Sequence, residues 1–186
     1  MQFGKYVTCD ISKCSGCRAC EMACFKEHNA GNGVGVSVGT VSVPVNPRLF
    51  VTKLSCEVSA PIQCKHCEDA PCLNACSKEA ISRIDGQVII DTDKCIGCKD
   101  CMLACPFGAI ELYKVYKNGE EVRQNGSDDC RIAAHKCDLC IDNPNGPACV
   151  RACPNEALFI VDPQDDKKKK NLAALETMLK TAGSEA

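Results

Sequence analysis

One cysteine-rich segment, C-I-G-C-K-D-C-M-L-A-C-P, constrains the fold of this chain more than any other feature. Cys95, Cys98 and Cys101 are each separated by two residues, and Cys105 follows after three more, directly before Pro106. With this spacing the first three thiolates share one tight loop and can bind three irons of a cubane iron–sulfur cluster, while the fourth ligates a second cluster. We expect the proline to start a helix that carries the fourth cysteine away from the loop. One such run therefore predicts a partner run elsewhere in the chain.

The rest of the chain contains three further runs. The first has the same spacing, the second has two extra residues before its third cysteine, and the fourth has eight residues at that place; they comprise Cys14, Cys17, Cys20 and Cys24, then Cys64, Cys67, Cys72 and Cys76, and finally Cys137, Cys140, Cys149 and Cys153. From the last cysteine of runs two, three and four the chain reads CSKEAI, CPFGAI and CPNEAL. This internal similarity indicates duplication of a unit with a ligand loop, a fourth ligand on a short helix, and an apolar strand.

Cysteine accounts for 19 of 186 residues, which predicts a scaffold held together by disulfides or by metal. The N-terminal residues resemble no signal peptide, and no apolar stretch is long enough to span a membrane. We therefore expect a cytoplasmic protein, in which so many cysteines bind metal rather than pair. Zinc is the alternative metal, but its structural sites usually use two separated cysteine pairs, and four repeated triplets argue against it.

Charge and composition exclude several functions. The formal net charge of -2 does not suit a nucleic-acid-binding protein. The sequence contains no candidate nucleophile, general base or open metal site that would indicate catalysis by this chain alone. We expect a non-catalytic protein.

The order of the runs predicts how they pair. The short separation between Cys76 and Cys95 is similar to the link between the two halves of bacterial two-cluster ferredoxins. Runs two and three should therefore form one module, and runs one and four should pair around it. The predicted fold class is α+β, with two ferredoxin-like modules, the second inserted within the first, and a C-terminal helix. Its predicted parts are an outer module (1–30 and 130–163), an insertion (31–55), an inner module (56–116), a loop (117–129) and a tail (164–186).

Between the runs, short strands are expected. Residues 5–10, 48–56, 111–116 and 158–161 read as strands, with Leu49, Val51 and Leu54 facing inward in the second. The dipeptide Asp85-Gly86 between two apolar stretches predicts a two-residue hairpin turn. The glycine-rich residues 30–43 favour a loop or an edge hairpin that could contact a partner.

Four such runs, with the second lengthened and the fourth carrying a long gap, resemble the four-cluster electron-transfer subunits of molybdenum and tungsten oxidoreductases, of the dimethyl sulfoxide reductase iron–sulfur subunit type. The segments QCKHCEDAPC and HKCDLCIDNPNGPACVRACP are most similar to the electron-transfer subunits of formate hydrogenlyase and hydrogen-dependent carbon dioxide reductase. The resemblance covers about residues 3–163. It implies four [4Fe-4S] clusters with crossed ligation, held by Cys14, Cys17, Cys20 and Cys153; by Cys137, Cys140, Cys149 and Cys24; by Cys64, Cys67, Cys72 and Cys105; and by Cys95, Cys98, Cys101 and Cys76.

The same resemblance implies a function and partners. The chain would relay single electrons between a formate dehydrogenase-type catalytic subunit and a hydrogenase or a second ferredoxin-like subunit. One alternative places it in another reductase or in a carbon monoxide-oxidising complex. Another makes it mainly a structural scaffold whose clusters act as cross-links.

The tail differs in composition from the rest of the chain. Leu172, Leu175, Leu179 and Ala182 form one stripe of a helix, and Gly183 is a plausible stop. The stripe predicts either a helix that folds back on its own domain or self-association through residues 165–182. The lysines at 167–170 could touch an anionic membrane surface.

Several residues near the runs lie outside the ligand pattern. For the three remaining cysteines, the role of a small buried hydrophobic residue is favoured over a redox or ligand role; these are Cys9, Cys56 and Cys130. Three histidines and three lysines adjoin ligand loops, where ordinary packing or solvated roles compete with hydrogen bonding to a cluster or offsetting its charge; these are His28, His66, His135, Lys65, Lys99 and Lys136.

Overall fold

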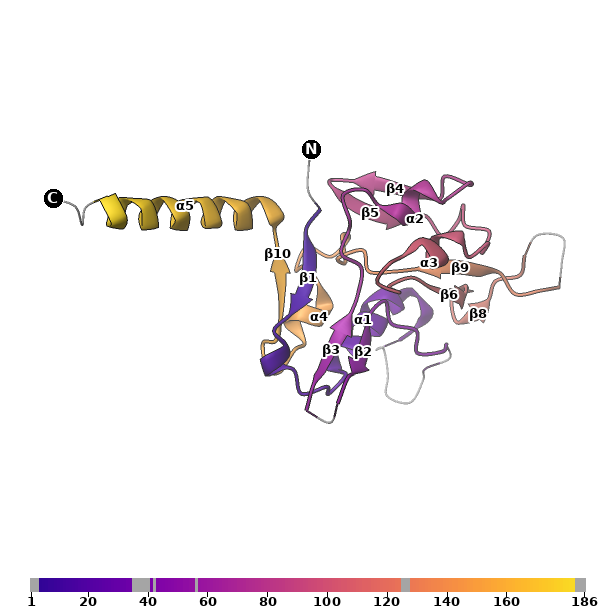
Figure 1. The fold of residues 1–186 in the computed structure, drawn as a ribbon. Helices are drawn as coiled ribbons and strands as arrows, with labels where there is room; N and C mark the ends of the chain where they lie inside the picture. Colours follow the sequence, from indigo (N-terminus) through magenta and orange to yellow (C-terminus); the bar gives the residue numbers. More distant parts are fainter. Residues whose placement is uncertain (1–3, 35–40, 42, 56, 125–127, 183–186) are drawn as a thin grey trace.

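The computed structural model describes residues 4–34, 41, 43–55, 57–124 and 128–182. Within them the chain is a small α+β protein made of short strand pairs and short helices, from which one long helix projects (Figure 1). The strands form five antiparallel pairs: β1 (Tyr6–Cys9) with β10 (Leu158–Val161), β2 (Phe50–Lys53) with β3 (Ser59–Ile62), β4 (Ile81–Ile84) with β5 (Gln87–Ile90), β6 (Glu111–Lys114) with β9 (Ile132–His135), and β7 (Tyr116–Lys117) with β8 (Glu120–Glu121).

The helices do not start where the sequence suggested. Besides the 3₁₀ turns η1 (Ile11–Lys13) and η2 (Ala30–Asn32), the helices are α1 (Ala19–His28), α2 (Pro71–Asn74), α3 (Asp100–Ala104), α4 (Ala148–Arg151) and α5 (Pro163–Ala182). In runs two, three and four the third cysteine lies on a helix, and the fourth follows the end of that helix. The expectation that the fourth cysteine lies on the start of a helix was therefore wrong.

The prolines explain part of this difference. A residue before proline is disfavoured in helical conformation, and Cys105 accordingly has extended angles, with φ -77° and ψ 114°. Run one has Phe25 after its fourth cysteine instead of a proline. There the helix continues to His28 and contains both Cys20 and Cys24.

Two clusters of buried side chains form the main cores. The first contains Val7, Leu49, Val51, Leu139 and Leu158, together with Cys20, Cys24, Cys137 and Cys149. The second contains Ile81, Val88, Ile110 and Ala134, together with Cys72 and Cys101. A small third cluster packs Phe25 against Val34 and Val43. Cysteines are thus part of both main cores rather than of surface loops alone.

The strand and helix contacts join segments that are far apart in sequence. Strand β1 precedes run one and pairs along its length with β10, which follows run four; Cys9 lies opposite Leu158. Helix α1 packs on α4, and α2 packs on α3. The hairpin predicted at Asp85-Gly86 is confirmed, since it joins β4 to β5 and both turn residues have positive φ, 49° and 81°.

Other strand expectations need correction. The strand expected over 48–56 is shorter, and Leu54 is 87% exposed, because the chain turns back after Lys53 to begin β3. Residues 111–116 divide into β6 and β7, and the loop expected at 117–129 contains β8. Much of the glycine-rich stretch (35–40 and 42), together with residues 125–127, lies outside the described residues.

Helix α5 extends away from the rest of the molecule (Figure 1). Its apolar stripe is open to solvent, with Leu172, Leu175 and Leu179 exposed at 53%, 54% and 66%. The expected helix is therefore present, but it does not fold back on its own domain; the stop expected at Gly183 lies outside the described residues. Of the helices in the described ranges, none combines the length and apolar character that crossing a membrane requires.

Candidate iron–sulfur centres

One pocket collects four cysteines from two runs. Cys95, Cys98 and Cys101 of run three line it together with Cys76 of run two. Its remaining wall is largely aliphatic, formed by Ile81, Ile90, Leu112 and Ala134 among others. Four thiols in an apolar pocket offer one sulfur for each iron of a cubane.

A second pocket collects cysteines from the two ends of the chain. Cys14, Cys17 and Cys20 of run one line it with Cys153 of run four. The pairing of β1 with β10 brings these runs together, since run one follows β1 and run four precedes β10. A fifth cysteine, Cys9 at the end of β1, lines the same pocket.

The cysteines of the second run lie near a cysteine of the third. Burial raises the pKa of Cys67, and Cys64 and Cys105 raise it further by their charge. Burial also raises the pKa of Cys72, with Lys136 lowering it and the same two cysteines raising it. Cys105 also packs against the buried cluster that contains Cys72, which places it near the second run.

The cysteines of the fourth run lie in the same way beside Cys24 of the first. Burial raises the pKa of Cys149 to about 12 and that of Cys140 to about 11, and the charge of Cys24 adds to both shifts. Cys137 is also buried, and burial raises its pKa well above the usual thiol value. Without metal these thiols stay protonated at neutral pH, so metal binding must displace their protons.

A left-handed backbone residue shapes each ligand loop. The residue before the second cysteine has positive φ in all four runs: Gly16 (68°), His66 (48°), Gly97 (73°) and Leu139 (60°). Glycine adopts this conformation without steric cost, whereas other residues pay about 1–2 kcal/mol. The conformation recurs in all four loops even though glycine occupies only two of these positions.

A second left-handed residue shapes the turn after the fourth cysteine. Glu79, Gly108 and Glu156 each stand three residues beyond that cysteine and have positive φ. In two of these turns the next backbone N–H donates to the cysteine sulfur: from Ala109 to Cys105 at 3.4 Å, and from Ala157 to Cys153 at 3.3 Å. The repeats CPFGAI and CPNEAL thus encode a turn that offers a hydrogen bond to the ligand sulfur.

Further donors point at ligand sulfurs elsewhere. The backbone N–H groups of Arg48, His66 and Ala134 donate to the sulfurs of Cys24, Cys64 and Cys95 at 3.3, 3.4 and 3.3 Å. Next to Cys64, both amide atoms of Gln63 are buried without a hydrogen-bond partner among the described residues. N–H groups directed at sulfur stabilise thiolates, and the sulfides of a cluster can accept from orphaned donors. The residues present therefore fit [4Fe-4S] clusters.

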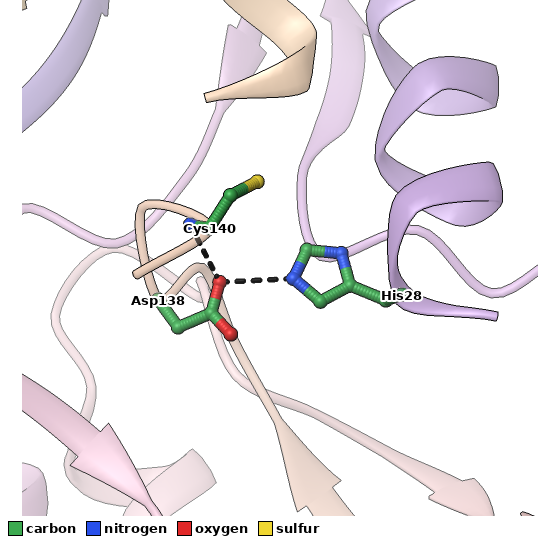
Figure 2. Close-up of side chains that lie close together, drawn as sticks. All are labelled: His28, Asp138 and Cys140. Atoms are coloured by element: carbon green, nitrogen blue, oxygen red, sulfur yellow. Dashed lines mark hydrogen bonds and ion pairs between the residues drawn. The ribbon is translucent and has the colours of Figure 1, made fainter. Parts of the chain in front are cut away.

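A charged network lies beside Cys24, and Figure 2 shows two of its members, His28 and Asp138, together with Cys140. His28 Nε2 donates to Asp138 Oδ1 at 2.9 Å, and the backbone N–H of Cys140 donates to the same oxygen at 3.0 Å. The other carboxylate oxygen of Asp138 accepts from the Arg48 guanidinium. His28 Nδ1 lies 2.8 Å from the Cys24 carbonyl oxygen and 3.6 Å from its sulfur. Both ring nitrogens therefore have acceptors.

This network is not a separate metal site. His28, Asp138 and Cys140 could approach a common ion. However, Asp138 already neutralises two cationic groups, and an added cation would face Arg48. Burial lowers the pKa of His28, but hydrogen bonds to Asp138 and Cys24 outweigh it and raise the pKa to about 9. We interpret the group as a support that holds a positive charge near the Cys24 sulfur.

Two other polar residues near the runs are buried. The Lys136 side chain is 3% exposed, and its ammonium donates to the carbonyl oxygens of Val88 and, at 3.1 Å, Cys137. His66 accepts from the Val88 N–H at 3.1 Å; burial first, then the charge of Lys136, lowers its pKa to about 3. Lys136 is therefore not a solvated lysine, whereas His66 has a packing role, one of the two roles favoured for it.

The sequence reasoning missed Arg48 and Asp138. Arg48 lies in a stretch that showed no chemistry in the sequence, and Asp138 is one acidic residue among many. The signal that could have found Asp138 is its position between Cys137 and Cys140, where an acidic side chain needs a nearby cation. Of the three cysteines outside the pattern, Cys9 joins the second pocket, Cys130 contacts Glu121 at 2.6 Å, and Cys56 lies outside the described residues.

Comparison with known proteins adds a family and relatives. A family model described as a 4Fe-4S dicluster domain matches residues 57–163, which include runs two, three and four. The putative electron transport protein YsaA of Escherichia coli K12 is 39% identical over 158 residues, covering 85% of this chain and 90% of the relative. The electron transport protein HydN of the same strain is 40% identical over 163 residues, covering 85% and 88%. Formate hydrogenlyase subunit 2 of that strain is 37% identical over 191 residues, covering 90% and 89%.

Proposed function

The chain belongs to the 4Fe-4S dicluster family, and from this premise we propose that it is an electron-transfer subunit that carries single electrons through four [4Fe-4S] clusters. A bound [4Fe-4S] cluster accepts and releases one electron at a time. The observation that carries the proposal is the gathering of cysteines from different runs in two pockets, each lined by four predicted ligands. Two similar relatives are named electron transport proteins, which supports the same role.

We assign the four ligand sets as crossed. The sets are Cys14, Cys17, Cys20 and Cys153; Cys137, Cys140, Cys149 and Cys24; Cys64, Cys67, Cys72 and Cys105; and Cys95, Cys98, Cys101 and Cys76. The lining of the two pockets supports the first and last sets. The mutual charge interactions of the cysteines support the other two.

We further propose that two ferredoxin-like modules are nested, with runs two and three inside and runs one and four outside. The packing of α1 on α4 and of α2 on α3 favours this pairing, as does the pairing of β1 with β10. Contact between the modules would let electrons pass from one to the other. Cys64 of the inner module packs against the core that contains Cys20, Cys24, Cys137 and Cys149.

The partners we propose are a formate dehydrogenase-type catalytic subunit on one side and a hydrogenase or a second ferredoxin-like subunit on the other. The name of one relative, formate hydrogenlyase subunit 2, supports this choice. If the chain belonged instead to another reductase or to a carbon monoxide-oxidising complex, it would still relay electrons, and only its partner subunits would differ. The wider assignment to the dimethyl sulfoxide reductase type rests on the pattern of four runs.

We also propose a cytoplasmic location and no reaction of the chain's own. None of the described cysteines is paired in a disulfide, which suits a reducing compartment. The chain's residues hold the clusters, direct N–H groups at their ligands and surround them with aliphatic side chains. The partner subunits at the two ends of the relay would catalyse the reactions that release and consume the electrons.

Helix α5 is proposed as the element for self-association, through residues 165–182. Its exposed leucine stripe supports this role. Truncation after Asp165 should reduce the size of the assembly, whereas substitution of Lys117, an exposed residue outside this helix, by Met should leave it unchanged. An unchanged size of the truncated protein in gel filtration would remove this part of the proposal.

Metal analysis tests the proposed function. Anaerobically purified protein should contain about 16 irons and about 16 acid-labile sulfides per chain, with negligible zinc. Reductive titration should then show that all clusters cycle, which separates a relay from a structural scaffold. Substantial zinc, or iron well below this content in fresh protein, would mean that at least one run is structural and that the relay is interrupted.

A further inference from the structure

The pocket of run one contains more thiols than one cluster needs. Cys9 lines it beside Cys14, Cys17, Cys20 and Cys153. We propose that Cys9 is a reserve ligand of this cluster and can take the place of Cys14. The proposal rests on the cluster assignment made above and adds to it a fifth cysteine that the four-run pattern omits.

Strand β1 directs Cys9 inward. Alternate residues of a strand face the same side, and Val7, two residues earlier, is fully buried in the first core. Cys9 packs against that same core, which contains Cys20. Its pairing with Leu158 of β10 fixes the strand next to the segment that follows Cys153. The position of Cys9 in the pocket is therefore set by regular structure rather than by a loose loop.

Cys14 is the ligand that Cys9 can replace. The two cysteines stand on either side of the 3₁₀ turn η1, and both line the pocket. Hydrogen bonds from the Lys13 N–H to the Asp10 carbonyl oxygen at 3.2 Å and from the Cys14 N–H to the Ile11 carbonyl oxygen at 3.3 Å close this turn and keep Cys14 near the end of β1. The Cys9 sulfur has one printed hydrogen-bond partner among the described residues, the Asp10 carbonyl oxygen at 3.5 Å. This weak contact leaves the thiol free to turn toward the pocket.

The exchange needs no oxidant or reductant. The Cys9 thiol gives its proton to solvent and its sulfur binds the iron, while the bond from the Cys14 sulfur breaks and that thiolate takes up a proton. In a chain without the Cys14 thiol, only the step at Cys9 occurs: its thiol loses the proton and its sulfur binds the iron during cluster assembly. The iron keeps four sulfur neighbours, and the cluster keeps its charge.

Cys130 provides a matched control. It also lies outside the four runs, but its sulfur contacts Glu121 and it lines neither of the two cysteine pockets. The double variants Cys9→Ala/Cys14→Ala and Cys14→Ala/Cys130→Ala remove the same number of thiols. They differ only in whether the reserve thiol remains.

Iron and sulfide content, with EPR of the oxidised protein, tests the proposal in the full-length chain. We expect about 16 irons in the wild type and in Cys14→Ala/Cys130→Ala. We expect Cys9→Ala/Cys14→Ala to lose at least about one iron, which would leave a three-iron cluster with its own EPR signal. At most it should lose about four irons, which is the whole cluster. Wild-type protein without this iron content would overturn the proposed function itself. Wild-type protein with all its iron, and equal iron in the two double variants, would overturn only the reserve ligand.

A second measurement covers variants that assemble poorly. Cys14→Ser keeps a polar side chain of similar size at the site. Prolonged native alkylation with iodoacetamide, followed by peptide mass spectrometry, should label Cys9 slowly in the wild type, because this thiol is half-buried, and should not label it in Cys14→Ser, where its sulfur is bound to iron; Cys130 should be labelled in both. Equal labelling of Cys9 in both proteins, or failure of Cys14→Ala/Cys130→Ala to accumulate when the wild type does, would count against the proposal.

Discussion

Two glycines that both have a positive φ allow a sharp test of the ligand loops. Gly97 precedes Cys98 and has φ +73°, whereas Gly108 follows the run and has φ +58°. A Cβ added at Gly97 would lie 3.0 Å from the Ile132 carbonyl oxygen, but one added at Gly108 would meet nothing within 4 Å. The substitutions Gly97→Ala and Gly108→Ala therefore share the backbone strain and differ in the close approach.

The expected costs follow from these two observations. A non-glycine residue in the left-handed region costs about 1–2 kcal/mol, which applies to both variants. The crowding at Gly97 adds about 1–3 kcal/mol, because Ile132 belongs to β9 and its backbone must shift against β6. If the crowding is relieved when the cluster is released, this difference makes release from Gly97→Ala about 5- to 150-fold faster than from Gly108→Ala.

The assay is the anaerobic loss of the brown cluster absorbance at a fixed guanidinium concentration. Far-UV circular dichroism before denaturant is added checks that both variants have folded. Equal release rates for the two variants, or faster release from Gly108→Ala, would refute the close packing of the run-three loop against Ile132.

Three further predictions concern charge and metal. Burial lowers the pKa of His28, but its hydrogen bonds to Asp138 and Cys24 outweigh burial and raise the pKa to about 9. Because this value exceeds the ordinary 6.5 of the unfolded chain, protonated His28 stabilises the folded state by about 3 kcal/mol. This stabilisation is complete below about pH 6.5 and is lost as the pH rises through about 9. Cluster release should therefore accelerate across that window in the wild type, and an unchanged pH profile in His28→Gln would contradict the assignment. Lys136→Met removes a buried cation close to the inner-module thiols, so one cluster potential should fall by on the order of 50 mV in a redox titration; Lys180→Met serves as the exposed control, and an unaltered set of potentials in Lys136→Met would oppose this. Removal of iron by a chelator should leave the chain largely unfolded, because thiols that form part of both cores lose their cross-links; native-like circular dichroism of the metal-free chain would speak against it.

The sequence predicted those parts of the fold that short-range chemistry determines. The turn at Asp85-Gly86 and the strand at 158–161 depend on neighbouring residues and were predicted with the observed bounds. The helix boundaries in the runs were not, because the interpretation gave the proline after the fourth cysteine a helix-starting role. Its effect on the preceding residue, which ends the helix, is the stronger one at Cys105.

The surroundings of the cysteines were harder to predict than the cysteines themselves. Ligand spacing is local, whereas the contact of Arg48 with Asp138 joins residues ninety positions apart and needs the fold to bring β2 near run four. The burial of Lys136 likewise depends on the Val88 carbonyl oxygen of β5, far away in sequence. From residue type alone, a lysine is expected at the surface. Here hydrogen bonds to two backbone carbonyl groups stabilise the buried ammonium.

The exposure of the cysteines indicates where electrons would enter and leave. Cys17 and Cys98 are exposed, whereas Cys24, Cys137, Cys140 and Cys149 are all buried. The exposed residues line different pockets, that of run one and that of run three. Under the proposed ligand sets, one cluster at the run-one pocket and one at the run-three pocket would each reach the surface through a single ligand loop, while the set completed by Cys24 stays enclosed. Partner subunits should therefore dock at the loops that contain Cys17 and Cys98, and the enclosed set should only pass electrons between clusters of this chain.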